Sequence, residues 1–146
     1  MNENGWNIQL ASWQEDSEAL RDIRDKVFVQ EQQVPLELEW DGLDQDAIHF
    51  IVQDVNLNQV GCARLLYDGQ VGRVAVLENL RRLGIGHALM RFVIQYAEEH
   101  AYPALFLHSQ ITAQDFYESL GFVAYGNVYE EAGIEHISMK RENSMR

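Results

Sequence analysis

The sequence predicts a single mixed α/β domain over residues 1–146, with a mostly antiparallel sheet flanked by helices. Strand-like runs and helix-like periodic segments alternate along the chain. Three of the strand-like runs follow one another across short turns, which is typical of an antiparallel meander. A length of 146 residues with 47% hydrophobic content is enough for one substantial core.

The first third of the chain predicts a strand, a helix and an acidic loop. Residues 7–13 alternate loosely in polarity, and Asp16 or Ser17 can cap the helix that follows. An apolar stripe extends this helix to residues 30–33, before Pro35, which disfavours helix at the preceding residue. An ordered surface loop is expected next. Its six carboxylates are Glu31, Glu37, Glu39, Asp41, Asp44 and Asp46.

The rest of the chain predicts two further helices among strands. Apolar residues at i, i+3 and i+4 predict a long helix over 85–97. Thr112 and Asp115 approximate a capping box for a short helix that ends at Leu120. The predicted strands lie at residues 47–55, 59–67, 71–77, 104–108, 122–125 and 134–139.

Charge and composition exclude several classes of protein. A net charge of −12 argues against a nucleic-acid partner, and no run of 18 apolar residues predicts a membrane span. The N-terminus shows no secretory signal, and the single cysteine, Cys62, fits a reducing, cytoplasmic setting as a packed strand residue. The histidines and the cysteine lack the spacing of metal ligands, so we expect no metal. Only five basic side chains, all arginines, stand between Val27 and Met139, and two of these are Arg81 and Arg82.

Those two arginines open a motif that predicts a pyrophosphate site. In the segment 81–86, Arg-Arg-Leu-Gly-Ile-Gly, a glycine turn leads into the long helix. The first turn of a helix has unpaired backbone N–H groups, glycine allows close approach to the backbone, and guanidinium groups bind phosphate. A P-loop is excluded because His87 and Ala88 follow the second glycine. A dinucleotide fingerprint is excluded because Leu89 replaces its third small residue.

A second motif lies on the short helix near the C-terminal strands. Ala113 and Tyr117 share one face of this helix, whereas Phe116 and Leu120 share another. We therefore expect Phe116 and Leu120 to be buried and Tyr117 to turn elsewhere.

Together the two motifs resemble a known family. Arg-x-x-Gly-x-Gly at 81–86 and Ala-x-x-x-Tyr-x-x-x-Gly-Phe at 113–122 are similar to the two signatures of the GCN5-related N-acetyltransferase (GNAT) family. The segments 24–49 and 133–139 are similar to an ElaA-like subgroup of it. The resemblance covers nearly the whole chain. It implies the GNAT acyltransferase fold and transfer of an acetyl group from acetyl-coenzyme A (acetyl-CoA) to an amine.

The resemblance also implies roles for particular residues. Tyr117 would protonate the departing thiolate as general acid. Gln110 stands where many members have an asparagine that contacts the cofactor, and its longer amide could reach the same groups or point elsewhere. The pantetheine arm would pair with the main chain at residues 74–76, and the pyrophosphate with the backbone after Arg81. The expected cofactor-binding residues are Val74, Ala75, Val76, Arg81, Arg82, Leu83, Gly84, Ile85, Gly86, His87, Ala88, Gln110 and Phe116.

The sequence leaves the general base and the acceptor open. The candidate bases are Glu31, Asp41 and His49, of which we name Glu31 and His49 with Tyr117 as catalytic residues. The acidic segment would attract a small cationic amine if its carboxylates face a cleft. An acyl-CoA sensor without catalysis is the alternative function, and a homodimer is left open.

Overall fold

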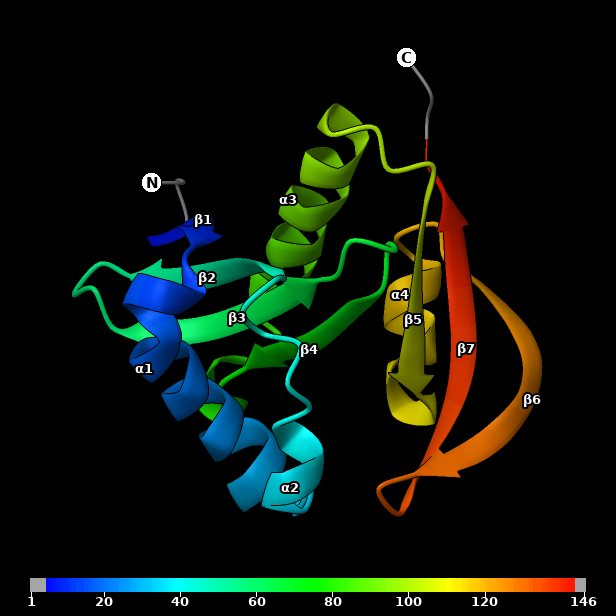
Figure 1. The fold of residues 1–146 in the computed structure, drawn as a ribbon, viewed down its shortest axis with the longest axis horizontal. Coiled ribbons are helices and arrows are strands. Elements are labelled where there is room, and N and C mark those ends of the chain that lie inside the picture. Colours follow the sequence, from blue (N-terminus) through cyan, green and yellow to red (C-terminus); the bar gives the residue numbers. More distant parts are fainter. Residues whose placement is uncertain (1–4, 144–146) are drawn as a thin grey trace.

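The computed structural model describes residues 5–143 (Figure 1). The N-terminal stretch in which we expect no secretory signal lies largely outside the described residues. Within them, no helix is both long and apolar enough to cross a bilayer. The elements are β1 (Trp6–Ala11), α1 (Trp13–Arg24), the π-helix η1 (Asp25–Glu31), α2 (Leu36–Glu39), β2 (Ile48–Asp54), β3 (Gln59–Leu65), β4 (Val71–Val76), the 3-10 turn η2 (Glu78–Leu80), α3 (Ile85–Glu99), β5 (Ala104–Gln110), the 3-10 turn η3 (Ile111–Ala113), α4 (Gln114–Glu118), β6 (Val123–Glu131) and β7 (Ile134–Glu142).

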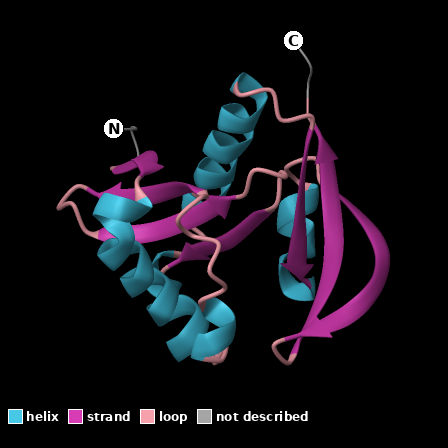
Figure 2. Cartoon of the chain, viewed as in Figure 1, coloured by secondary structure: helices cyan, strands magenta, loops and turns pink. Residues whose placement is uncertain are grey.

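The strands form two antiparallel sheets that splay apart (Figure 2). The first has the order β1-β2-β3-β4 and the second β5-β7-β6. They join where Gln70 and Phe106 form a parallel bridge just before β4. This junction requires glycine at position 69, because φ is +100° and a Cβ would lie 2.6 Å from the carbonyl oxygen of Ala104. Beyond the junction β4 and β5 are the facing edges of the two sheets.

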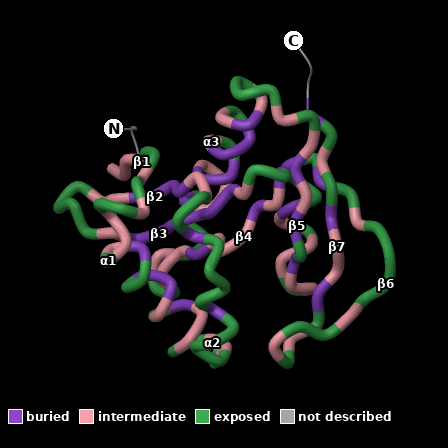
Figure 3. Tube along the Cα trace, viewed as in Figure 1, coloured by how far each residue is buried: buried purple, intermediate pink, exposed green. Residues whose placement is uncertain are grey.

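Alternation along the strands divides the core between two helices. Phe50 and Val52 of β2 belong to the cluster packed with α3, whereas Ile51 between them packs with Leu20 and Ile23 of α1. The first sheet is therefore covered by α1 on one face and by α3 on the other. Buried residues concentrate in β2, β3 and β5, and the outer strand β6 is largely exposed (Figure 3). The predicted mixed α/β fold with mostly antiparallel strands is confirmed.

Helix ends differ from those predicted. The first helix begins at Trp13, and Asp16 accepts a hydrogen bond from the backbone N–H of Ser12 (2.8 Å) instead of capping a later start. The capping box of Thr112 and Asp115 is wrong, because a 3-10 turn occupies 111–113 and α4 begins without a side-chain cap. Neither helix start therefore uses the side-chain cap that the sequence predicts.

Candidate functional site

A cavity of about 640 Å³ lies between the diverging edges of β4 and β5. One side of the cavity is formed by β4 together with η1, α2 and the residues around them. The other side is formed by β5 and by the turn between β6 and β7. Strand β4 is bulged there, since Arg73 and Val74 together oppose Ala63 of β3 and Arg73 has φ +52°. As the last strand of its sheet, β4 leaves the outward main-chain groups of residues 74–76 without a partner strand among the described residues.

The glycine motif forms a cradle of open N–H groups beside this cavity. Gly84 is left-handed (φ +88°) at the start of α3, and a Cβ there would meet nothing within 4 Å. Within residues 5–143, no backbone N–H of residues 82–87 donates to a backbone carbonyl, whereas that of Ala88 donates to Gly84 (3.0 Å). Phe116 of α4 packs against Gly86, where a Cβ would lie 3.5 Å from its ring. Such a cradle fits a diphosphate.

Arg81 ties the cradle to the end of η1. Its Nε donates to the carbonyl oxygen of Val76 (3.0 Å), and its two terminal nitrogens donate to the two carboxylate oxygens of Glu31 (2.5 and 2.6 Å). The hydrogen bonds from Arg81 lower the pKa of Glu31. Glu31 does not line the cavity. The structure therefore places this predicted base in a clamp with Arg81.

Besides Glu31, three carboxylates of the acidic segment pair with arginines. Arg24 is 1% exposed and contacts Glu39 (2.6 Å) and Asp44 (2.8 Å), while Arg64 and Arg73 complete the ion pairs with these carboxylates and with Asp41. Burial opposes ionisation of Asp41, yet the hydrogen bonds from Arg64 hold its pKa at about 2. Three guanidinium groups thus balance Glu39, Asp41 and Asp44, so these three of the six carboxylates do not offer free negative charge to the cavity.

His49 supports this charged cluster from behind. It is 1% exposed, its Nε2 lies 2.8 Å from the carbonyl oxygen of Asp44, and its ring stacks on Trp13. Burial lowers the pKa of His49. It does not line the cavity. The structure thus brings neither Glu31 nor His49 to the cavity that holds Tyr117.

Tyr117 lies with its ring in the core and contributes to the cavity wall. It is 9% exposed, so the expectation that it turns away from the buried face is wrong. Phe116 and Phe122 contact its ring edge-to-face, at 5.0 and 5.8 Å between centroids. Burial raises the pKa of Tyr117 to about 12, and no described residue pairs with its hydroxyl.

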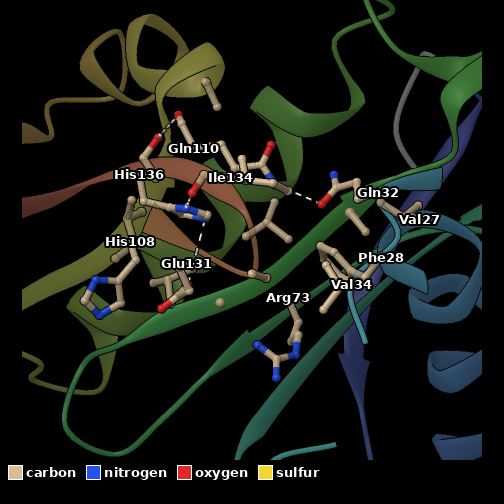
Figure 4. A pocket seen from close by; sticks show the side chains of 18 of the residues that line it. Val27, Phe28, Gln32, Val34, Arg73, His108, Gln110, Glu131, Ile134 and His136 are labelled. Atoms are coloured by element: carbon tan, nitrogen blue, oxygen red, sulfur yellow. Dashed lines mark hydrogen bonds and ion pairs between the residues drawn. The ribbon is translucent and has the colours of Figure 1, made fainter. Parts of the chain in front are cut away.

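The opposite wall contains polar residues that sequence reasoning missed. His108 of β5, Glu131 of β6 and His136 of β7 line the cavity, and none of them is among the residues that the sequence predicted for the site (Figure 4). The available signal was the segment 133–139, similar to the ElaA-like subgroup. Gln110 also lines the cavity, and its Nε2 donates to Gln32 Oε1 (2.9 Å).

Two splayed sheets, a bulged edge strand and a glycine cradle at the next helix define an acyl-CoA N-acyltransferase. The Acetyltransferase (GNAT) domain matches residues 14–143, and the chain belongs to this family. Protein ElaA of Escherichia coli K12 is 38% identical over 133 residues, which cover 85% of this chain and 86% of ElaA. The protein is an acetyltransferase that uses acetyl-CoA.

Solved structures agree with this assignment. The crystal structure of Escherichia coli ElaA superposes with a TM-score of 0.84 at 33% identity, covering 94% of this chain and 99% of that one. An acyl-CoA N-acyltransferase from Pseudomonas aeruginosa gives a TM-score of 0.83 at 32% identity, covering 93% and 99%. The predicted GNAT fold is thereby confirmed.

Proposed function

We propose that the enzyme transfers the acetyl group of acetyl-CoA directly to the primary amine of a small acceptor. One observation carries the proposal: the unpartnered hydroxyl of Tyr117 belongs to a residue lining the same cavity as the open edge of β4. Direct transfer is favoured because Cys62 lies outside the cavity lining, and burial raises the pKa of its thiol to about 12. A thiol with that pKa is a poor nucleophile at neutral pH.

In this proposal the cradle and the edge strand hold the cofactor. The diphosphate accepts hydrogen bonds from the N–H groups after Arg81, and the pantetheine arm adds to β4 along Val74, Ala75 and Val76. The cofactor-binding roles of Gln110 and Phe116 remain part of the proposal. The contact of Arg81 with the Val76 carbonyl occupies one acceptor on that edge. Arg81 would therefore change partners when the arm binds.

Tyr117 acts as the general acid in this proposal. A phenol whose pKa is about 12 stays protonated at neutral pH and can donate to the leaving thiolate. The burial that weakens it as an acid also raises the pKa of a thiol in the same surroundings, so proton transfer between them stays feasible.

The two walls of the cavity indicate an acceptor with an apolar body. One wall presents Val27, Phe28 and Val34, and the other presents His136 and Glu131 (Figure 4). The carboxylates of Glu39 and Asp41 in the cavity wall are paired with arginines, so the carboxylate of Glu131, whose side chain is 57% exposed, is the one left to attract the ammonium group. We propose an ammonium group at this second wall and an apolar body against the first.

A panel of amines tests the proposal, with release of free thiol as the readout. We expect an arylalkylamine to be acetylated faster than a polyamine or an amino sugar. Tyr117→Phe should lower kcat by about 100-fold or more while leaving the affinity for coenzyme A unchanged. A wild-type protein that binds coenzyme A and acetylates no amine would instead support the sensor function.

A further inference from the structure

We propose that His136 is the general base that takes a proton from the acceptor's ammonium group, with Glu131 stabilising the protonated ring. The inference rests on the proposed amine acetylation and assigns the base that it requires. It is carried by the orientation of one imidazole in the cavity wall opposite the charged cluster.

The tautomer of His136 is fixed by the main chain. Its Nδ1 lies 2.7 Å from the carbonyl oxygen of Ile134, which can only accept a hydrogen bond. In the neutral ring Nδ1 therefore carries the proton and Nε2 keeps its lone pair. The side chain of His136 is 9% exposed and its ring stacks on Tyr129 at an interplanar angle of 25°, so the orientation is held from two sides.

The free nitrogen faces a carboxylate. Glu131 Oε2 lies 3.8 Å from His136 Nε2, close enough to stabilise the imidazolium that forms when the ring takes a proton. Among the described residues, the titratable Tyr129 also packs on the imidazole ring of His136. The residue of β5 that pairs with His136 in the sheet is Gln110, which is neutral. The three arginines that line the cavity, Arg64, Arg73 and Arg81, each pair with a carboxylate of the acidic segment.

Other ionisable groups that line the cavity are less suited to this role. Asp41 has a pKa of about 2, and Glu39 accepts from Arg24 while paired with Arg73, so both carboxylates are already bound to guanidinium groups. At His108 two hydroxyl groups converge on Nδ1, from Tyr129 (2.5 Å) and from Ser138 (3.5 Å). This arrangement favours the proton of His108 on Nε2, which leaves no free lone pair.

The transfer balances with these groups. His136 Nε2 takes one proton from the ammonium, and the freed lone pair forms the new C–N bond to the acetyl carbonyl carbon. The C–S bond breaks, and the thiolate takes the phenolic proton of Tyr117. The nitrogen of the new amide loses its second proton, which restores Tyr117 through solvent. His136 then releases its proton to water, so one proton is released for each amine acetylated.

The test compares His136→Gln with His100→Gln over a range of pH. His100 is a matched control because its Nδ1 also lies 2.8 Å from a main-chain carbonyl oxygen, that of Tyr96, while its ring is outside the cavity. We expect His136→Gln to lower kcat/KM for the amine by about 100-fold or more and to remove the fall in rate at acidic pH that protonation of a general base causes. His100→Gln should keep both, and all three proteins should bind coenzyme A equally.

The outcomes separate this inference from the proposed function. Amine acetylation by His136→Gln at more than a tenth of the wild-type rate, with the acidic fall retained, overturns the base assignment and leaves the function intact. Wild-type transfer only to acceptors without an amine overturns both. Glu131→Gln should lower kcat/KM for the amine severalfold, because the imidazolium loses its carboxylate; an unchanged kcat/KM contradicts the role given to Glu131.

Discussion

Replacing Arg24 by methionine should destabilise the protein more than any surface change. Arg24 donates to Glu39 Oε1 (2.6 Å) and to both oxygens of Asp44 (2.8 and 3.2 Å) at 1% exposure. Its removal turns a neutral group of three arginines and three carboxylates into one with an excess negative charge. Breaking a buried pair costs about 3–5 kcal/mol, and we expect the lower end because Arg73 and Arg64 still contact the two carboxylates.

Thermal and urea unfolding measure this effect. A loss of about 3 kcal/mol corresponds to a fall in Tm of about 6–12 °C for a chain of this size. Arg21→Met is the control, because Arg21 lies on the same helix but is exposed, with its guanidinium over Trp13 and Trp40. We expect the control to lose about 1 kcal/mol or less. Adding Glu39→Gln to Arg24→Met should recover part of the loss.

The pH dependence gives a second check on the same variant. Burial opposes ionisation of Asp44, yet the hydrogen bond from Arg24 lowers its pKa, so this ion pair stabilises the folded state above the ordinary pKa of aspartate. That contribution is lost as pH falls through the lowered value. The difference in stability between wild type and Arg24→Met should therefore shrink below about pH 4. A variant within about 1 kcal/mol of wild type at pH 7 would refute the reasoning.

Three further outcomes are expected. Glu31→Gln should bind coenzyme A up to about fivefold more tightly at low salt, because Arg81 loses its clamp, whereas the exposed Glu37→Gln should not; equal affinities would contradict the clamp. Asp41→Asn should reduce, by about 1 kcal/mol, the stability that the protein loses between about pH 4 and pH 2, because the ionised Asp41 stabilises the folded state above this range and loses that effect as it is protonated. An unchanged loss of stability would count against the Arg64 contact. Cys62 should react with a thiol reagent at pH 8 only after unfolding in urea, and rapid labelling of the folded chain would contradict its burial.

Much of the fold could be predicted because it rests on local pattern. Alternation located β2 and β3, helical spacing located α3, and the glycine motif marked the start of that helix. Helix entry points were missed, since the turns before Trp13 and Gln114 depend on what the helices pack against. The sequence has no residue pattern that distinguishes the π-helix η1 from an α-helix. The bulge at Arg73 changes the alternation of apolar residues in β4 too little to be detected from the sequence.

The site was less predictable because it depends on pairing across the fold. The sequence could propose Tyr117 and the cradle, because each belongs to a compact motif with its own spacing. It could not show that Asp41 meets Arg64 or that Glu31 meets Arg81, since such contacts join residues far apart in the chain. For the same reason nothing in the sequence indicated that His136 lines the cavity.

By itself the sequence determined how the acetyl donor would be recognised. A glycine turn at the start of a helix needs only neighbouring residues to expose its N–H groups to a diphosphate. Only the tertiary structure decided which charges are free, because the free energy of a charged side chain depends on its burial and on partners brought from other elements. The packing of α1, β3 and β4 brings three arginines onto Glu39, Asp41 and Asp44 of the acidic segment. That packing leaves the polar wall of β5, β6 and β7, lined by His108, Glu131 and His136, as the side of the cavity to which we assign the acceptor.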